Sequence, residues 1–153
     1  METITPQIID DPLACPACDI KTGMPLIKDG TMMRFTIRTP EKKVNQEKGT
    51  ERVEFRAETT KPCYDTENNE LQPGYKIVVR INGASGERKA DALARDLASL
   101  IQAVEGKASK TTPRQIWDNP ALFDGKVVDA KVKIQAGKNG FNDQNILTYL
   151  PPA

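Results

Sequence analysis

One segment limits the possible folds of this chain more than any other, because it alone has a sustained helical period. Between Glu87 and Val104 the apolar side chains recur at steps of three and four, which places them on one face of a helix. Ser85 is suited to cap the start of this helix, and Gly106 can adopt the left-handed conformation that ends one. We therefore expect one long helix with one buried face, in a chain that otherwise has the pattern of β-strands.

Strict alternation of polar and apolar residues predicts five strands. The clearest case runs from Met33 to Arg38, where Met33, Phe35 and Ile37 share one side and the polar residues between them share the other. The expected strands cover residues 33–38, 52–60, 75–81, 126–135 and 145–150. Three of these strands precede the helix and two follow it.

Polar residues, prolines and glycines predict the connections between these elements. Residues 40–50 and 61–74 are expected to be loops. After the helix, Thr112-Pro113 and Asn119-Pro120 each place a proline at the first position of a short helical turn. Three apolar side chains are expected to anchor this connector to the core: Trp117, Leu122 and Phe123.

The order of elements, three strands, a helix and two strands, is that of the OB-fold, a small, partly open five-stranded barrel. We therefore expect a mainly β fold with one long helix, in which residues 31–153 form a single OB-like domain. Residues 1–30, with four prolines and no clear period, are expected to be an irregular N-terminal arm. An α+β sheet covered on one face by the helix has the same order and is the alternative.

Composition argues against several classes of protein. The chain of 153 residues contains no histidine, which removes the commonest general base, the Ser-His and Cys-His pairs and the usual ligand of catalytic zinc. No pair or cluster of carboxylates has the form of an acid–base or two-metal site. No apolar run is long enough to cross a bilayer, and the first residues do not have the pattern of a signal peptide. We expect a protein that is not an enzyme, uses no cofactor and has no membrane partner.

The cysteines leave one chemical alternative open. Cys15 and Cys18 have the spacing of a redox pair or of half a zinc site, with Cys63 far along the chain. A redox pair opens a helix, however, and the sequence after Cys18 is broken by glycine and proline. Reduced, structural thiols and no bound metal are therefore the expectation, and a small zinc-dependent or redox-dependent regulator is the alternative.

Charge is balanced over the whole chain, at 22 basic and 21 acidic residues, but not across the predicted strands. In their polar phase, basic side chains outnumber Glu54, Glu58 and Asp129. The basic residues are Arg34, Arg38, Arg52, Arg56, Lys76, Arg80, Lys131 and Lys133. Such a face can neutralise the phosphates of an extended nucleic acid, and aromatic side chains can stack on its bases. The simpler alternative is a solvated strand face with cross-strand ion pairs.

Residues outside these strand faces complete the expected binding site. The two long loops would add residues at its rim. These are Lys42, Lys43 and Lys48 in the loop over residues 40–50, Lys138 in the glycine-rich turn over residues 137–140, and Phe141. Tyr64 and Tyr149 are the other aromatic candidates for stacking on bases.

Four parts of the chain together form a pattern of turns and strand edges. They are residues 25–37, Leu71-Gln72-Pro73-Gly74-Tyr75, residues 122–130, and Asn145 with Tyr149-Leu150-Pro151. This pattern resembles a family of small bacteriophage proteins of uncharacterised function, whose members tend to lie among replication and recombination genes. In layout it is similar to the OB-fold single-stranded-DNA-binding proteins of phages. The resemblance implies a protein of the cytoplasm of a bacterial host.

Two functions from different classes follow. The leading hypothesis is a phage-type protein that binds single-stranded DNA, without enzymatic activity, and protects and holds it during replication or recombination. The alternative is a structural or assembly protein of a virion, in which the N-terminal arm and long loops reach neighbouring subunits. Either protein could also associate with itself.

Overall fold

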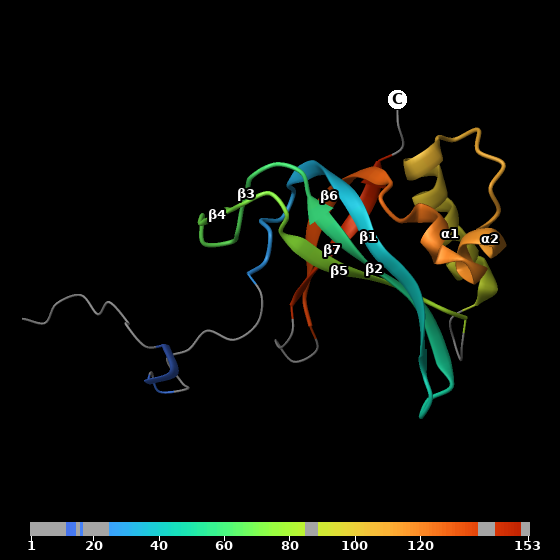
Figure 1. The fold of residues 1–153 in the computed structure, drawn as a ribbon, viewed down its shortest axis with the longest axis horizontal. Coiled ribbons are helices and arrows are strands. Elements are labelled where there is room, and N and C mark those ends of the chain that lie inside the picture. Colours follow the sequence, from blue (N-terminus) through green and yellow to red (C-terminus); the bar gives the residue numbers. More distant parts are fainter. Residues whose placement is uncertain (1–11, 15, 17–24, 85–88, 138–142, 151–153) are drawn as a thin grey trace, which may run out of the picture.

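A five-stranded antiparallel sheet forms the body of the protein in the computed structural model (Figure 1). The structure describes residues 12–14, 16, 25–84, 89–137 and 143–150. The strands follow one another across the sheet in the order β5-β2-β1-β6-β7. Their bounds are β1 Met32–Asn45, β2 Thr50–Thr59, β5 Lys76–Asn82, β6 Val127–Gln135 and β7 Gln144–Leu150. The mainly β fold and the five predicted strands are therefore confirmed.

The hairpin of β1 and β2 is longer than its sequence pattern predicts. The loop prediction is wrong for residues 40–45, because β1 continues through Pro40 and pairs with β2 as far as Asn45, and it is confirmed only for the turn at residues 46–49. A register shift between Arg38 and Glu41 accommodates the proline, and β6 pairs with β1 only as far as Thr36. Pro40 therefore lies at a bulge and outside the β1–β6 ladder, the kind of position in which a strand tolerates proline.

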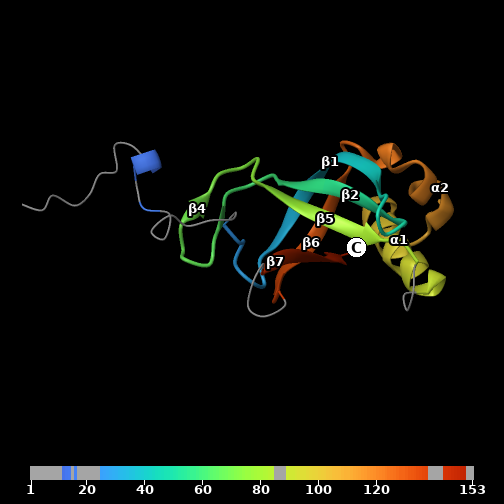
Figure 2. The same ribbon diagram turned by 90° about the horizontal axis from the view of Figure 1, so that it is seen from below.

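A small hairpin lies beyond one end of the sheet, inside the segment predicted as a loop. Its strands, β3 (Cys63–Tyr64) and β4 (Glu70–Leu71), pair with each other. Asp65 holds the turn between them, since its carboxylate accepts hydrogen bonds from the backbone N–H groups of Glu67 and Asn69 at 2.8 and 2.9 Å. Figures 1 and 2 show this hairpin at the end of the sheet opposite α1 and α2.

Residues 25–30 pack against the sheet, although their sequence pattern groups them with the N-terminal arm. Ile27 has no exposed surface. The side chain of Asn145 accepts a hydrogen bond from the backbone N–H of Ile27 at 2.8 Å and donates one to its carbonyl at 2.9 Å. The N–H of Gly30 donates to the carbonyl of Val132 at 2.7 Å. Before residue 25, the described residues include one short 3-10 turn, η1 (Pro12–Ala14).

The long helix α1 (Ala90–Glu105) lies over one end of the sheet. It begins later than the predicted Glu87, because the backbone of Lys89 is extended, with φ −89° and ψ 158°. Residue 85, the predicted cap, lies outside the described residues. The helix ends at Gly106, whose φ of 96° is the positive value that favours glycine, so the predicted end is confirmed.

Both predicted proline turns are present after α1. Thr112 begins α2 (Pro113–Asp118) with a capping box, in which side chain and backbone exchange hydrogen bonds with Gln115. The next turn is a 3-10 helix, η3 (Pro120–Phe123), whose last residue is buried. Trp117 is 7% exposed and anchors the connector as expected, whereas the same prediction for Leu122 is wrong, since that side chain is 53% exposed.

The core lies between α1 and the inner face of the sheet. Phe35 on β1 and Phe55 on β2 are at most 1% exposed, and Leu97 and Leu100 of α1 at most 2%. Burial of such large apolar side chains supplies most of the favourable free energy of folding. The inner face is therefore committed to the core, and only the opposite face of the strands is available to a partner.

The two edge strands, β5 and β7, face each other without pairing. Because every neighbouring pair in the sheet is antiparallel, these two strands run in the same direction. A groove of about 500 Å³ between them is lined by both strands and by Asp96 and Ser99 of α1. The sheet is therefore curled, but in the described part of the chain no strand pairing closes it into a barrel.

Candidate nucleic-acid interface

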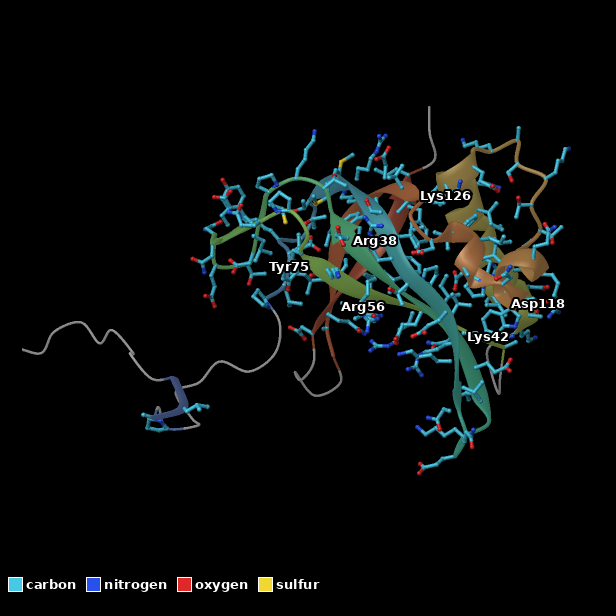
Figure 3. The ribbon with its side chains drawn as sticks, in the orientation of Figure 1. Arg38, Lys42, Arg56, Tyr75, Asp118 and Lys126 are labelled. Atoms are coloured by element: carbon cyan, nitrogen blue, oxygen red, sulfur yellow. The ribbon has the colours of Figure 1, made fainter. Side chains whose placement is uncertain are left out.

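The basic residues predicted from the strands all lie on one side of the sheet, termed here the outer face because it is opposite the core. Directly paired residues of an antiparallel sheet point to the same side, and alternate residues along a strand do so too. The register pairs Arg38 with Arg56 and Glu54 with Arg80, and Figure 3 shows Arg38 and Arg56 on the two neighbouring strands. The residues brought together are Arg34, Arg38, Arg52, Arg56, Lys76, Arg80, Lys131 and Lys133.

Glu54 is the centre of an ion-pair cluster on this face. Its side chain is only 3% exposed, because cationic side chains from three strands surround it. The Nζ atom of Lys43 lies 2.7 Å from the carboxylate, and the Nε atom of Arg80 lies 3.0 Å from it. The nearest nitrogens of Arg52 and Arg56 each lie at 3.3 Å. These five residues are termed the Glu54 cluster.

The cluster keeps Glu54 ionised. Burial acts in the opposite direction, since it removes water from the charged carboxylate and so raises its pKa. Hydrogen bonds from Lys43, Arg56 and Arg52, together with the charge of Lys43, outweigh burial and lower the pKa of Glu54 from 4.5 to about 2. At neutral pH the carboxylate is therefore charged and holds the surrounding cations in fixed positions.

Three further carboxylates on the outer face also pair with cations. Glu41 lies 3.4 Å from the Nζ atom of Lys43. Asp129 accepts two hydrogen bonds from the Arg34 guanidinium, at 2.9 and 3.2 Å, and these bonds lower the pKa of Asp129. Glu58 lies 3.6 Å from the Nε atom of Arg38 and 3.9 Å from the Nζ atom of Lys76. Cross-strand ion pairs, which were the simpler explanation of the basic residues, are therefore present.

Positive charge nevertheless remains on the outer face. No described carboxylate pairs with Lys131 or Lys133 on β6, and Glu54 and Glu58 each serve more than one cation. The cations are the predicted residues together with Lys43, and the carboxylates are Glu41, Glu54, Glu58 and Asp129. Nine cations against four carboxylates leave a net charge of five positive units on this face.

The predicted aromatic residues are mostly not on this face. Tyr149 pairs with Ala130, which is fully buried, so Tyr149 points to the core and the prediction that it stacks on bases is wrong. Burial also raises the pKa of its hydroxyl group. Lys138 and Phe141 lie outside the described residues. Tyr64 on β3 is 54% exposed and is the aromatic candidate that remains available.

The sequence predicts Lys43 in a loop at the rim of the site, but its place on β1 beside Glu54 and the central position of Glu54 are not evident from the sequence pattern. Pro40 indicates the end of a strand, but alternation resumes beyond the bulge and places Glu41 and Lys43 on the outer face. The signal for the cluster is the spacing Arg52-x-Glu54-x-Arg56, which puts opposite charges on one side of a strand. The cations that surround a given carboxylate are determined by the register of the strands. That register depends on the bulge at Pro40.

The described residues give no indication of metal or membrane chemistry. They contain no group of three or more side chains placed to hold a metal ion. Cys63 is a buried free thiol, and its burial raises its pKa. Cys15 and Cys18 lie outside the described residues. None of the described helices is both long enough and apolar enough to cross a bilayer.

A comparison with models of known protein families found none that matches this chain, and a comparison with curated proteins found no match either. The function is therefore inferred from the charges and the geometry of the outer face.

Proposed function

We propose that this protein binds single-stranded DNA along the outer face of its sheet and, without enzymatic activity, protects and holds the strand during replication or recombination. The observation that carries the proposal is the net charge of five positive units on that face, in a chain whose total charge is +1. Phosphates that approach such a face displace their condensed counterions, which supplies a sequence-independent affinity.

The strand order supports this proposal. In the order β5-β2-β1-β6-β7, the three strands before α1 lie side by side, and the two strands after it extend the sheet from β1. We infer an OB-like barrel that is open between β5 and β7. Barrels of this type hold extended oligonucleotides against strands of the sheet. The resemblance to small bacteriophage proteins supports a role in phage DNA metabolism within the host cytoplasm.

A single strand fits the outer face better than a duplex does. The cations project from neighbouring strands of the sheet, a surface along which an extended chain of phosphates can lie. Guanidinium groups, which dominate on β1, β2 and β5, can bind phosphate and also stack on exposed bases. Bases are accessible for stacking only when they are unpaired, so the same residues interact more strongly with single strands.

The direct test is fluorescence anisotropy of a labelled oligothymidine and of a duplex of the same length, measured over a range of salt. We expect tighter binding to the single strand. If about five phosphates are neutralised, the logarithm of the binding constant should fall with the logarithm of salt with a slope of about −3.5. Absence of binding at low salt would refute the proposal and favour a virion assembly role.

A pair of matched double variants locates the binding surface. Arg56→Ala/Arg80→Ala removes two cations from the outer face and should reduce the steepness of the salt dependence by about 1.4. Arg95→Ala/Arg114→Ala removes the same charge from exposed positions on α1 and α2 and should leave binding unchanged. Equal effects of the two variants would show that net charge, and not this face, determines binding.

A further inference from the structure

A groove of about 440 Å³ lies next to the outer face, at the end of the molecule that carries the β3–β4 hairpin. We term it the Tyr64 groove. It is formed where the start of β1 meets the segment that leads into β3. Its lining residues include Lys28, Met32, Met33, Lys61, Tyr64 and Asn68.

The lining of this groove combines exposed apolar surface with positive charge. Tyr64 is 54% exposed and Met32 is 65% exposed, among the largest values for apolar side chains in the described structure. Two lysines, Lys28 and Lys61, line the groove as well, and no carboxylate is among its described lining residues. A flat aromatic ring, a thioether and two cations suit a ligand that has both a planar apolar part and a negative charge.

Tyr64 is held on a rigid support. Its neighbour Cys63 is 5% exposed, which fixes the side of β3 that faces inward. The carbonyl of Tyr64 accepts a hydrogen bond from the backbone N–H of Lys28 at 3.0 Å. The hydroxyl of Thr60, which precedes β3, donates to the carbonyl of Arg34 on β1 at 2.8 Å. The backbone of Tyr64 is therefore bonded to the segment that leads into β1, and the chain four residues earlier is bonded to β1 itself.

The groove is continuous with the outer face. Met32 lines the groove and is also paired with Lys131, one of the lysines for which the described residues offer no carboxylate partner. Arg34 lies two residues further along the same strand and on the same side. A chain of phosphates that follows the outer face along β1 and β6 therefore leads to the mouth of the groove.

We propose that the Tyr64 groove binds one nucleobase of a single strand whose phosphates lie on the outer face. The base stacks on Tyr64 and contacts the thioether of Met32, while Lys61 and Lys28 neutralise the flanking phosphates. This inference rests on the proposed function and adds to it a specific site for base stacking. It also explains why an aromatic ring is exposed beside two lysines at the end of a basic sheet face.

The test compares Tyr64→Ala, Tyr64→Phe and Lys61→Ala on oligothymidine and on an oligomer of the same length that lacks bases. Tyr64→Ala should weaken oligothymidine binding by roughly 5-fold to 100-fold with an unchanged salt slope, because stacking releases no counterions. Tyr64→Phe should bind like the wild type. Lys61→Ala should reduce the steepness of the salt dependence by about 0.7. Circular dichroism and thermal melting would verify that each variant is folded.

The oligomer without bases separates stacking from charge. The wild type should prefer oligothymidine to it, and Tyr64→Ala should lose most of that preference. If Tyr64→Ala keeps the wild-type preference, the groove does not bind a base. This result would leave the proposed function standing as long as Arg56→Ala/Arg80→Ala weakens binding. If the wild type binds neither oligomer at low salt, the proposed function itself fails.

Discussion

The two halves of the outer face hold their positive charge in different ways. On β1, β2 and β5, the cations of the Glu54 cluster share one carboxylate that is 3% exposed. On β6, Lys131 and Lys133 have no carboxylate partner among the described residues, and the carboxylate of that strand, Asp129, pairs with Arg34. One half is therefore a fixed network, whereas the other carries two lysines that make no ion pair with a described carboxylate.

This difference separates two uses of charge. A buried carboxylate costs free energy unless cations surround it, so the Glu54 cluster contributes to stability and holds its guanidinium groups in place. Unpaired lysines contribute little to stability, but all of their charge is available to a phosphate. We therefore expect substitutions in the first half to act on folding as well as on binding, and those in the second half to act on binding alone.

The largest expected effect follows from Glu54→Gln. The substitution keeps the shape of the side chain but removes the carboxylate that four neighbouring cations share. Of these four, Lys43 keeps a second carboxylate, since its Nζ atom also lies 3.4 Å from Glu41. The free energy of unfolding at pH 7 should fall by about 3 kcal/mol. Chemical denaturation monitored by circular dichroism measures this change.

The matched control is Glu51→Gln, on the same strand. Glu51 is 47% exposed and lies 3.6 Å from Lys42 in a single ion pair. Because solvent screens such a pair, its loss should cost less than about 1 kcal/mol. Equal losses for the two variants would refute the special position of Glu54.

The stability difference between the wild type and Glu54→Gln should depend on pH. The pKa of Glu54 is lowered to about 2 in the folded state, from 4.5. A lowered pKa stabilises the folded state above pH 4.5, and this contribution, about 3 kcal/mol, is lost as the pH falls from about 4.5 to 2. Denaturation curves should therefore show the difference between wild type and Glu54→Gln closing over that range. A difference that is constant with pH would contradict the lowered pKa.

The strands and the basic face could be predicted from the sequence because both depend on alternation alone. Phe35 and Ile37 fix the buried phase of β1, and Arg34 and Arg38 then fall on the opposite side without any knowledge of strand partners. The long helix and its end at Gly106 follow in the same way from local spacing and from the conformation of glycine.

Features that depend on register or on packing between distant segments could not be predicted in this way. The position of Lys43 beside Glu54 requires the bulge at Pro40, and the end of β1 at Asn45 depends on pairing with β2. The sequence does not decide which side chains of β7 face the core. Tyr149 could lie on either face, and only its pairing with Ala130 places it toward the core. The Tyr64 groove joins residues around positions 30 and 60, which no local pattern brings together.

Lys131→Ala/Lys133→Ala tests the half of the face in which the lysines have no carboxylate partner in the described part of the chain. The double variant should leave the free energy of unfolding within about 0.5 kcal/mol of the wild type, since neither side chain makes an ion pair with a described residue. The slope of the logarithm of the oligothymidine binding constant against the logarithm of salt should become less steep by about 1.4. Anisotropy titrations at several salt concentrations measure this slope. A loss of stability without a change in slope would reverse the assignment of the two halves.

Arg34→Ala gives the smallest expected effect on the salt dependence, because it removes a single cation, which lies on β1 and pairs with Asp129 on β6. Its bond to Asp129 is short, at 2.9 Å, yet the two side chains are 58% and 41% exposed, so its loss should cost at most about 1 kcal/mol in thermal or chemical denaturation. The same variant exposes the charge of Asp129 beside Lys131, which lies two residues along β6 on the same side. We therefore expect weaker DNA binding than the loss of one cation alone would give, and Arg34→Ala/Asp129→Asn should recover most of the difference. If the double variant binds no better than Arg34→Ala, then Asp129 does not repel the phosphates. In that case Arg34 on β1 and Lys131 on β6 do not contact the same DNA strand.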